Sequence, residues 1–136
     1  MSYLLDTDIV VYHLNEVQAA SELVDELFDV GVAMSIITYV EVLDGIDRSS
    51  DPQLARERFS EMIATMPVIA FGRQEARELI EIRQSLRRYG RNVRRRALDL
   101  QIAATARAHN LTLVTNNPDD YRGIDDLNLH SAEIAP

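Results

Sequence analysis

The sequence predicts an α/β domain with a central, mostly parallel sheet of four to five strands and helices on both faces. Short apolar runs alternate with longer amphipathic stretches along the chain, which is typical of strands separated by helices. Because a helix between successive strands carries the chain back to the same edge of the sheet, neighbouring strands are expected to pair in parallel. At 136 residues, without a repeat or a low-complexity linker, the chain is expected to form one domain over residues 1–136.

In the first half of the chain, apolar spacing and helix-ending residues define the elements. Strands are expected at residues 3–5 and 32–34, and helices at 9–14, 17–30, 35–45 and 54–66. In the second helix, apolar side chains recur at helical spacing from Ala20 to Phe28, and Gly31 ends it. Ser35 leaves its strand directly and is expected to begin the third helix, whereas Pro52 lies near the start of the fourth.

The second half of the chain repeats the alternation. Strands are expected at residues 68–70, 111–115 and 127–129, and helices at 74–89 and 98–109. Apolar residues from Ala76 to Leu86 follow helical spacing in the first of these helices, and Asn110 ends the second. Residues 117–120, which contain Pro118, are expected to form a turn.

Composition excludes several classes of protein. The chain has no Cys, which excludes a disulfide scaffold and thiolate chemistry, and no Lys, which excludes a Schiff base or a P-loop lysine. The three histidines are scattered and are interpreted as surface or packing residues. The N-terminus lacks a basic signal region, and no stretch reaches the roughly 18 uncharged residues of a membrane span, so we expect a cytoplasmic protein without membrane contact.

The charge of the chain is strongly uneven. The formal net charge is -8, which argues against general nucleic-acid binding, yet six arginines and no acid lie within residues 87–96. This run is either a solvated loop or helix end, or a cationic arm that binds phosphates while Tyr89 stacks on a base. The arginines of the run are Arg87, Arg88, Arg91, Arg94, Arg95 and Arg96.

Acidic side chains follow the ends of the expected strands. Asp6 and Asp8 come after the first strand, and Glu41 lies on the helix after the second. Asp99 begins the helix that leads into the fourth strand, and Asp120 follows that strand. Because the carboxyl ends of parallel strands share one edge, these carboxylates are expected to gather there. Clustered carboxylates repel one another, and oxygen-only ligands favour Mg²⁺, with Mn²⁺ as a substitute.

Each of these residues also has a purely structural interpretation. Asp6 or Asp8 would cap the helix that starts near residue 9, and this role suits Asp8 better. Asp99 would favour the helix dipole, and Asn117 before a proline is an ordinary turn residue. Glu41 differs because the helix positions around it are apolar, where a solvated Glu has little reason to lie.

Three segments resemble the successive signatures of PIN-domain ribonucleases, most closely the VapC-type toxins of bacterial and archaeal toxin–antitoxin pairs. The segments are LLDTDIVV, SIITYVEVLDG and LDLQIAATARAHNLTLVTNNPDDY, and the last is the most specific. They cover nearly the whole chain in the right order. The resemblance implies a three-layer PIN-like fold.

The resemblance also implies the residues of a site. The first three catalytic carboxylates of the family fall on Asp6, Glu41 and Asp99, with Asp6 and Asp99 as direct metal ligands. The fourth position falls on Asp120 or on Asn117, and both alternatives stay open. The positions that would support the acids are Thr7, Asp8, Ser35, Thr115 and Asn117.

The activity implied is that of a Mg²⁺-dependent endoribonuclease, which hydrolyses RNA phosphodiester bonds with a metal-activated water. The arginines of residues 87–96 would bind the flanking phosphates. The partner implied is a VapB-type antitoxin, with the helices of residues 17–66 as candidates for its binding surface. A homodimer and a toxin–antitoxin hetero-oligomer are expected, with operator DNA contacted only through the antitoxin.

Two other interpretations remain open. A PIN-like fold without catalysis would serve as a binding or scaffold module, and Asn117 keeps this possibility open because many PIN nucleases have an Asp there. A phosphatase of the haloacid dehalogenase type also begins with a strand followed by Asp-x-Asp, as at Asp6 and Asp8. That class balances its phosphoaspartate with a lysine, which this chain lacks.

Overall fold

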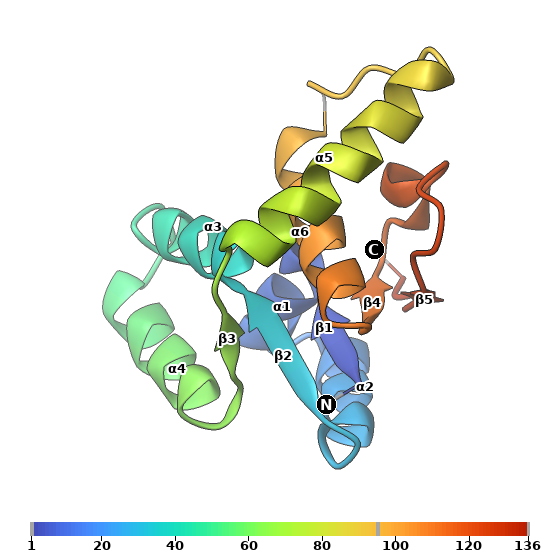
Figure 1. Cartoon of the computed structure of the whole chain (residues 1–136). Helices are drawn as coiled ribbons and strands as arrows, with labels where there is room; N and C mark the ends of the chain where they lie inside the picture. Colours follow the sequence, from blue (N-terminus) through green and yellow to red (C-terminus); the bar gives the residue numbers. More distant parts are fainter. Residues whose placement is uncertain (1, 95, 136) are drawn as a thin grey trace.

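A computed structural model describes residues 2–94 and 96–135, and Arg95, one of the predicted phosphate-binding arginines, lies outside the described residues. The described residues form a five-stranded sheet in which every neighbouring pair is parallel (Figure 1). In spatial order the strands are β3 (Val68–Ile69), β2 (Val32–Ser35), β1 (Tyr3–Leu5), β4 (Thr112–Thr115) and β5 (Leu129–Ser131). The predicted parallel α/β fold is therefore confirmed.

The strand order creates a switch point beside β1. From β1 the chain adds β2 and then β3 on one side, and it later adds β4 and β5 on the other side. The crossovers on the two sides of β1 therefore diverge at the carboxyl ends of β1 and β4, which is where open α/β sheets usually bind their ligands. This is the edge at which the sequence predicts the acids to meet.

Helices cover both faces of the sheet and give it two hydrophobic cores. The helices are α1 (Thr7–Leu14), α2 (Gln18–Phe28), α3 (Ile36–Ile46), α4 (Pro52–Thr65), α5 (Arg73–Arg88) and α6 (Ala97–Ala108), with a short 3₁₀ helix, η1 (Pro118–Tyr121). Strand side chains alternate between the faces: Leu5 and Val114 pack with α1, α2 and α4, whereas Leu4 and Leu113 pack with α5 and α6. In Figure 1, α5 and α6 cross the front of the sheet and α1 and α2 lie behind it.

Local capping explains where the helices of the first half begin. Ser35 caps α3, because its Oγ accepts a hydrogen bond from the Thr38 amide at 3.1 Å, as the sequence predicts. Asp51 caps α4 through the Leu54 amide, and Pro52 occupies the first turn. The expectation for α1 was wrong in one respect: the helix begins at Thr7, and Asp6 rather than Asp8 is its N-cap.

Helices α5 and α6 are joined by polar contacts at one end of the pair. The Nε2 atom of His109 lies 2.7 Å from a carboxylate oxygen of Glu75, which is buried. Burial alone would raise the pKa of Glu75, but hydrogen bonds from the Gly72 and Glu75 amides and from His109 hold it below its ordinary value. His109 therefore has a packing role, in agreement with its interpretation from the sequence.

Other elements differ slightly from expectation. The last strand is Leu129–Ser131 rather than 127–129, and it pairs with β4 through Thr115 and Ser131. Helix α2 is shorter than expected at both ends. The described helices include none with the length and apolar character needed to cross a bilayer.

Candidate active site

The pairing of β1 and β4 sets the position of the first acid. Leu5 pairs with Val114, and the backbone amide of Asp6 donates to the Val114 carbonyl at 2.9 Å. Asp6 and Thr115 therefore leave the sheet side by side at its carboxyl edge. Their side chains meet directly: Thr115 Oγ1 donates to Asp6 Oδ2 at 2.8 Å.

Asp6 is the most enclosed of the predicted carboxylates, with 6% of its surface exposed. Its Oδ1 accepts the Thr7 amide at 2.8 Å, and its Oδ2 accepts the Tyr121 hydroxyl at 2.9 Å as well as Thr115. Burial raises the pKa of Asp6 above its ordinary value, the charge of Asp120 adds to the rise, and the three hydrogen bonds oppose it. The side chain is thus fixed in one orientation in a site where negative charge is costly.

Glu41 joins the site through Thr7. The Thr7 hydroxyl donates to Glu41 Oε1 at 2.8 Å and lies 3.0 Å from the hydroxyl of Thr38, which is buried. A hydroxyl has one proton, so Thr7 gives its proton to Glu41 and accepts one from Thr38. The polar chain explains why a glutamate occupies an otherwise apolar helix face.

Asp99 lies in the first turn of α6. Its pKa is raised to about 6 by burial, and then by the charges of Asp6, Asp120 and Glu41, while Arg96 opposes the rise. Four predicted acids from distant parts of the chain therefore act on one another electrostatically. A partly buried group whose pKa is shifted by several neighbouring carboxylates is typical of a functional site.

Asp8 acts as a brace between α1 and the end of β4. Its Oδ1 accepts the Ile9 amide at 2.7 Å, and its Oδ2 accepts the Asn116 amide at 3.0 Å. Burial, followed by the charge of Asp6, raises the pKa of Asp8 to about 6. The Asn116 side chain in turn bonds to both backbone groups of Ile134, so the brace extends to the C-terminal segment.

The two candidates for the fourth position occupy different places. Asn117 is exposed, and its backbone amide donates to Thr115 Oγ1 at 3.0 Å. Asp120 is half-buried on η1, and its charge acts on both Asp6 and Asp99. The electrostatics of the site therefore favour Asp120.

The arginines of the 87–96 run do not form one uniform arm. The described members Arg87, Arg88, Arg91 and Arg94 are exposed. Arg91 donates through Nη1 to the Arg122 carbonyl at 3.3 Å, and Arg96 donates to the Asp120 carbonyl. Arg91 and Arg96 thus hold the loop around η1, which leaves Arg87, Arg88 and Arg94 as the described side chains with no such contact to that loop.

The acids do not form a preassembled metal cluster. Within residues 2–94 and 96–135, no three histidine or acidic side chains are arranged closely enough to hold one ion together. The acids are linked in two other ways. Thr7 bonds to both Asp6 and Glu41, and neighbouring acids raise the pKa of Asp6 and of Asp99.

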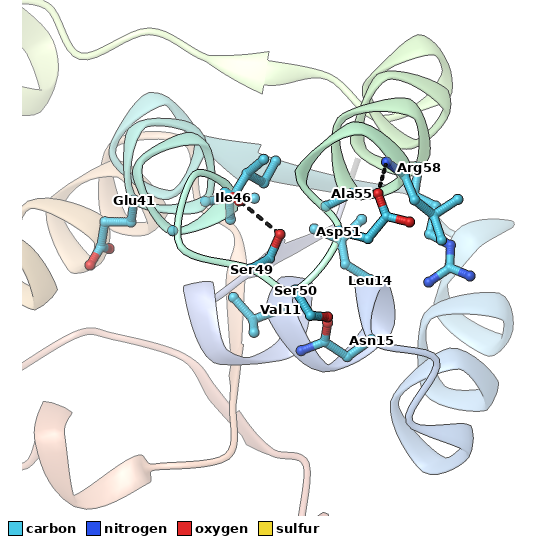
Figure 2. Close-up of a pocket in the computed structure, with 13 residues that line it drawn as sticks. Val11, Leu14, Asn15, Glu41, Ile46, Ser49, Ser50, Asp51, Ala55 and Arg58 are labelled. Atoms are coloured by element: carbon cyan, nitrogen blue, oxygen red, sulfur yellow. Dashed lines mark hydrogen bonds between the residues drawn. The ribbon is translucent and has the colours of Figure 1, made fainter.

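A cavity of about 250 Å³ lies between α1, α3 and α4, and Glu41 is the one acid of the site that lines it. In Figure 2, Glu41 lies at one end and Arg58 at the other. Apolar side chains supply much of the wall: Val11, Leu14, Val42, Ile46, Leu54 and Ala55. The surface next to the site therefore suits an apolar ligand or peptide.

Sequence reasoning missed three residues that organise the site. Thr38, Asn116 and Tyr121 are linked by hydrogen bonds to Thr7, Asp8 and Asp6, respectively. Asn116 directly follows β4 and Tyr121 ends the four-residue helix η1, and neither segment is long enough for periodicity to distinguish a contact residue from a loop residue. Thr38 had a signal, because it is a polar residue next to an apolar stretch of a predicted helix.

The fold and the site define a class of protein, and comparison with known proteins identifies it. The PIN domain family matches residues 3–127. The chain belongs to this family. The predicted resemblance to its VapC-type members is also confirmed by the relatives described next.

The relatives match over nearly their full length. The chain is 26% identical over 127 residues to the tRNA(fMet)-specific endonuclease VapC of Shigella flexneri, a match that covers 91% of this chain and 92% of that protein. It is 29% identical over 133 residues to Ribonuclease VapC2 of Rickettsia felis, a match that covers 96% of this chain and 98% of that protein. The crystal structure of VapBC2 from Rickettsia felis bound to a promoter DNA fragment matches with a TM-score of 0.86 and 28% identity, over 96% of this chain and 98% of that one.

Proposed function

We propose that this chain is the ribonuclease toxin of a VapBC-type toxin–antitoxin pair and hydrolyses RNA phosphodiester bonds at the acids beyond the carboxyl ends of β1 and β4. The observation that carries the proposal is that Asp6, Asp120 and Glu41 all raise the pKa of Asp99, and that Asp120 also raises the pKa of Asp6. The names of the VapC relatives support the same activity. Asp6, with three hydrogen-bond donors, is the residue on which the site is built.

We propose Mg²⁺ as the cofactor, with Mn²⁺ as a substitute. The donor set fits, because it consists of oxygen atoms and because the pKa of Asp99 is raised by burial and then by the charges of three neighbouring acids, a charge that a cation would offset. Mg²⁺ is usually bound by one or two carboxylates and several waters, so Asp6 and Asp99 would hold it directly without a third carboxylate in contact. When bound, the ion would lower the pKa of a coordinated water and offset charge on the scissile phosphate.

The remaining residues would position water and substrate. Glu41, fixed by Thr7, and Asp120, on η1, would accept hydrogen bonds from waters of the site. Arg87, Arg88 and Arg94 are exposed and would bind phosphates on either side of the cleaved bond. Arg91 and Arg96 would act indirectly, by holding the loop that carries Asp120.

An RNA cleavage assay with Mg²⁺ tests the activity. The variants Asp6→Asn and Asp99→Asn keep side-chain size and remove charge, and each should lower the cleavage rate by orders of magnitude. Asp25→Asn is the matched control, because Asp25 is exposed on α2 and is not one of the acids of the site. Cleavage by Asp6→Asn at the rate of the unchanged protein would reject the assignment.

A PIN-like binding module without catalysis is the second candidate. It is favoured by the lack of a group of three preassembled ligands among the described residues and by Asn117, which stands where many PIN nucleases have an Asp. Calorimetric titration with Mg²⁺ separates the two candidates. A binding module should show no heat of cation binding, whereas a nuclease should bind the ion and lose affinity on Asp6→Asn.

We also propose a VapB-type antitoxin as partner, seated in the cavity between α1, α3 and α4. The cavity has an apolar wall and reaches Glu41, so an occupant would lie next to one of the proposed catalytic acids. Replacing Leu54, which is 39% exposed on this wall, by Glu should prevent co-purification with the antitoxin. The same replacement at Ile80, which is 48% exposed on α5, is the control. Equal loss with both variants would contradict this location.

The proposed function also includes the oligomers that the chain forms. A homodimer and a toxin–antitoxin hetero-oligomer are proposed, in the cytoplasm, with operator DNA bound through the antitoxin alone. The formal net charge of -8 supports that last point, because DNA binding normally needs a basic surface. Light scattering of the chain with and without the antitoxin, followed by a DNA-shift assay on each, tests the assembly.

A further inference from the structure

Tyr121 is the largest fully buried side chain, with 1% of its surface exposed, and it lies at the end of η1. Its ring packs in the core shared by Leu100 and Leu113, while its hydroxyl reaches Asp6 Oδ2 at 2.9 Å. The ring alone would satisfy this apolar setting. A buried hydroxyl is costly unless it is hydrogen-bonded, so the contact with Asp6 is the feature that accounts for the hydroxyl.

The directions of the hydrogen bonds at Asp6 follow from proton counting. Thr115 Oγ1 accepts the Asn117 amide and gives its one proton to Asp6 Oδ2. A phenol carries its one proton at neutral pH, and the Tyr121 hydroxyl lies 2.9 Å from Asp6 Oδ2, so it also donates to Oδ2. Oδ2 therefore accepts two hydroxyl protons, whereas Oδ1 accepts only the Thr7 amide.

A carboxylate oxygen has two strong accepting positions. At Asp6 both positions of Oδ2 are filled, and one position of Oδ1 remains. Without the Tyr121 hydroxyl, both oxygens would have one free position each. The hydroxyl thus decides whether Asp6 offers one oxygen or two to a cation.

We propose that Tyr121 is a positioning residue that restricts Asp6 to a single ligand oxygen and so favours Mg²⁺ over Ca²⁺. This inference rests on the proposed function and deepens it. Mg²⁺ demands near-octahedral geometry and takes single carboxylate oxygens, whereas the larger Ca²⁺ accepts carboxylates through one oxygen or both. Freeing Oδ2 would therefore benefit Ca²⁺ more than Mg²⁺.

The test is the variant Tyr121→Phe, which removes the hydroxyl and keeps the ring. Calorimetric titrations of the full chain with MgCl₂ and with CaCl₂, at one pH, give the ratio of the two dissociation constants. We expect the ratio to shift toward Ca²⁺ by about ten-fold, the scale on which one hydrogen bond to a charged group changes an equilibrium. A merely structural defect would weaken both ions alike and leave the ratio unchanged.

Two further variants frame the result. Thr115→Val removes the other donor to Oδ2 and should shift the ratio in the same direction. Tyr39→Phe removes the hydroxyl of a tyrosine whose ring packs on Phe59, outside the site, and should leave the ratio as it is. An unchanged ratio in Tyr121→Phe, with Mg²⁺ still bound, overturns this inference alone. Failure of the unchanged protein to bind either ion overturns the proposed function and the ion preference together.

A measurement without metal tests the contact itself. Urea unfolding in EDTA of Tyr121→Phe, Asp6→Asn and the double variant forms a thermodynamic cycle. If the hydroxyl is bonded to the charged carboxylate, Tyr121→Phe should raise the unfolding constant of the otherwise unchanged protein. The factor should be about ten times larger than the factor by which Tyr121→Phe raises the unfolding constant of Asp6→Asn. Additive effects of the two replacements would overturn the inference even if metal binding is intact.

Discussion

Replacing Asp99 by Asn should stabilise the metal-free protein at neutral pH although it removes a proposed metal ligand. The pKa of Asp99 is raised from its ordinary 3.8 to about 6 by burial and by three neighbouring acids. The folded state therefore holds the proton of Asp99 more tightly than the unfolded state does. Stability from this group is highest below pH 4, falls as the pH rises toward 6, and then stays constant.

The magnitude follows from the size of the rise. A rise from 3.8 to about 6 corresponds to roughly 3 kcal/mol at 1.36 kcal/mol per pH unit. Asp99 is only partly buried, so solvent screening reduces this figure to about 1–2 kcal/mol. At pH 7.5 the variant should gain about that amount in free energy of unfolding, and at pH 3.5 it should gain little, because Asp99 is protonated in both states.

Urea unfolding in EDTA at pH 3.5 and 7.5 measures the effect. Asp25→Asn, at an exposed position of α2, serves as the control for loss of one negative charge and should show no gain at the higher pH. An Asp99→Asn protein that is less stable than the unchanged protein at pH 7.5 would refute the reasoning. It would mean that Asp99 makes favourable contacts that outweigh its repulsion from the other acids.

Three more predictions follow from other contacts of the fold. Thr7→Val removes the donor to Glu41 and should lower the single-turnover rate of RNA cleavage about ten-fold, with a midpoint of thermal unfolding close to that of the unchanged protein. Glu75→Gln removes the carboxylate that is hydrogen-bonded to His109 and to the Gly72 amide, and it should cost about 1–3 kcal/mol in urea unfolding at pH 7. The unchanged protein should lose this same contribution as the pH falls below 4.5, because the pKa of Glu75 is lowered in the fold. Phe59→Ala empties a buried position of the core and should cost about 3–5 kcal/mol by the same measurement.

The sequence predicted the sheet well because burial alternates along short strands. Leu4 and Leu5 lie on opposite faces, and each has its own helical layer to fill. It predicted the acids at one edge because parallel strands share a carboxyl edge, whatever their distance along the chain. It placed the last strand two residues too early, because residues 127–131 are only partly buried or exposed and their pattern does not fix the register.

The side-chain partners of the acids were much harder to predict than the acids. Asp6 was read from its place after a strand, but its contact with Tyr121 joins residues 115 positions apart through a helix of 4 residues. The sequence offered Asp6 and Asp8 as N-caps of a helix near residue 9, and both accept a nearby amide, but the helix begins at Thr7 with Asp6 as its N-cap. Long-range hydrogen bonds of this kind leave no local pattern in the sequence.

The contacts of Asp6 show that stability alone does not explain the site. Three donors lower the pKa of Asp6, yet burial and Asp120 leave it above its ordinary value, so the donors offset only part of the cost of the charge. Replacing these acids by apolar residues of similar size would suit a core designed only to be stable. An arrangement that orients a carboxylate with three donors and still leaves its charge unbalanced is suited to a positively charged ligand, and this argument supports a metal site independently of the family of the chain.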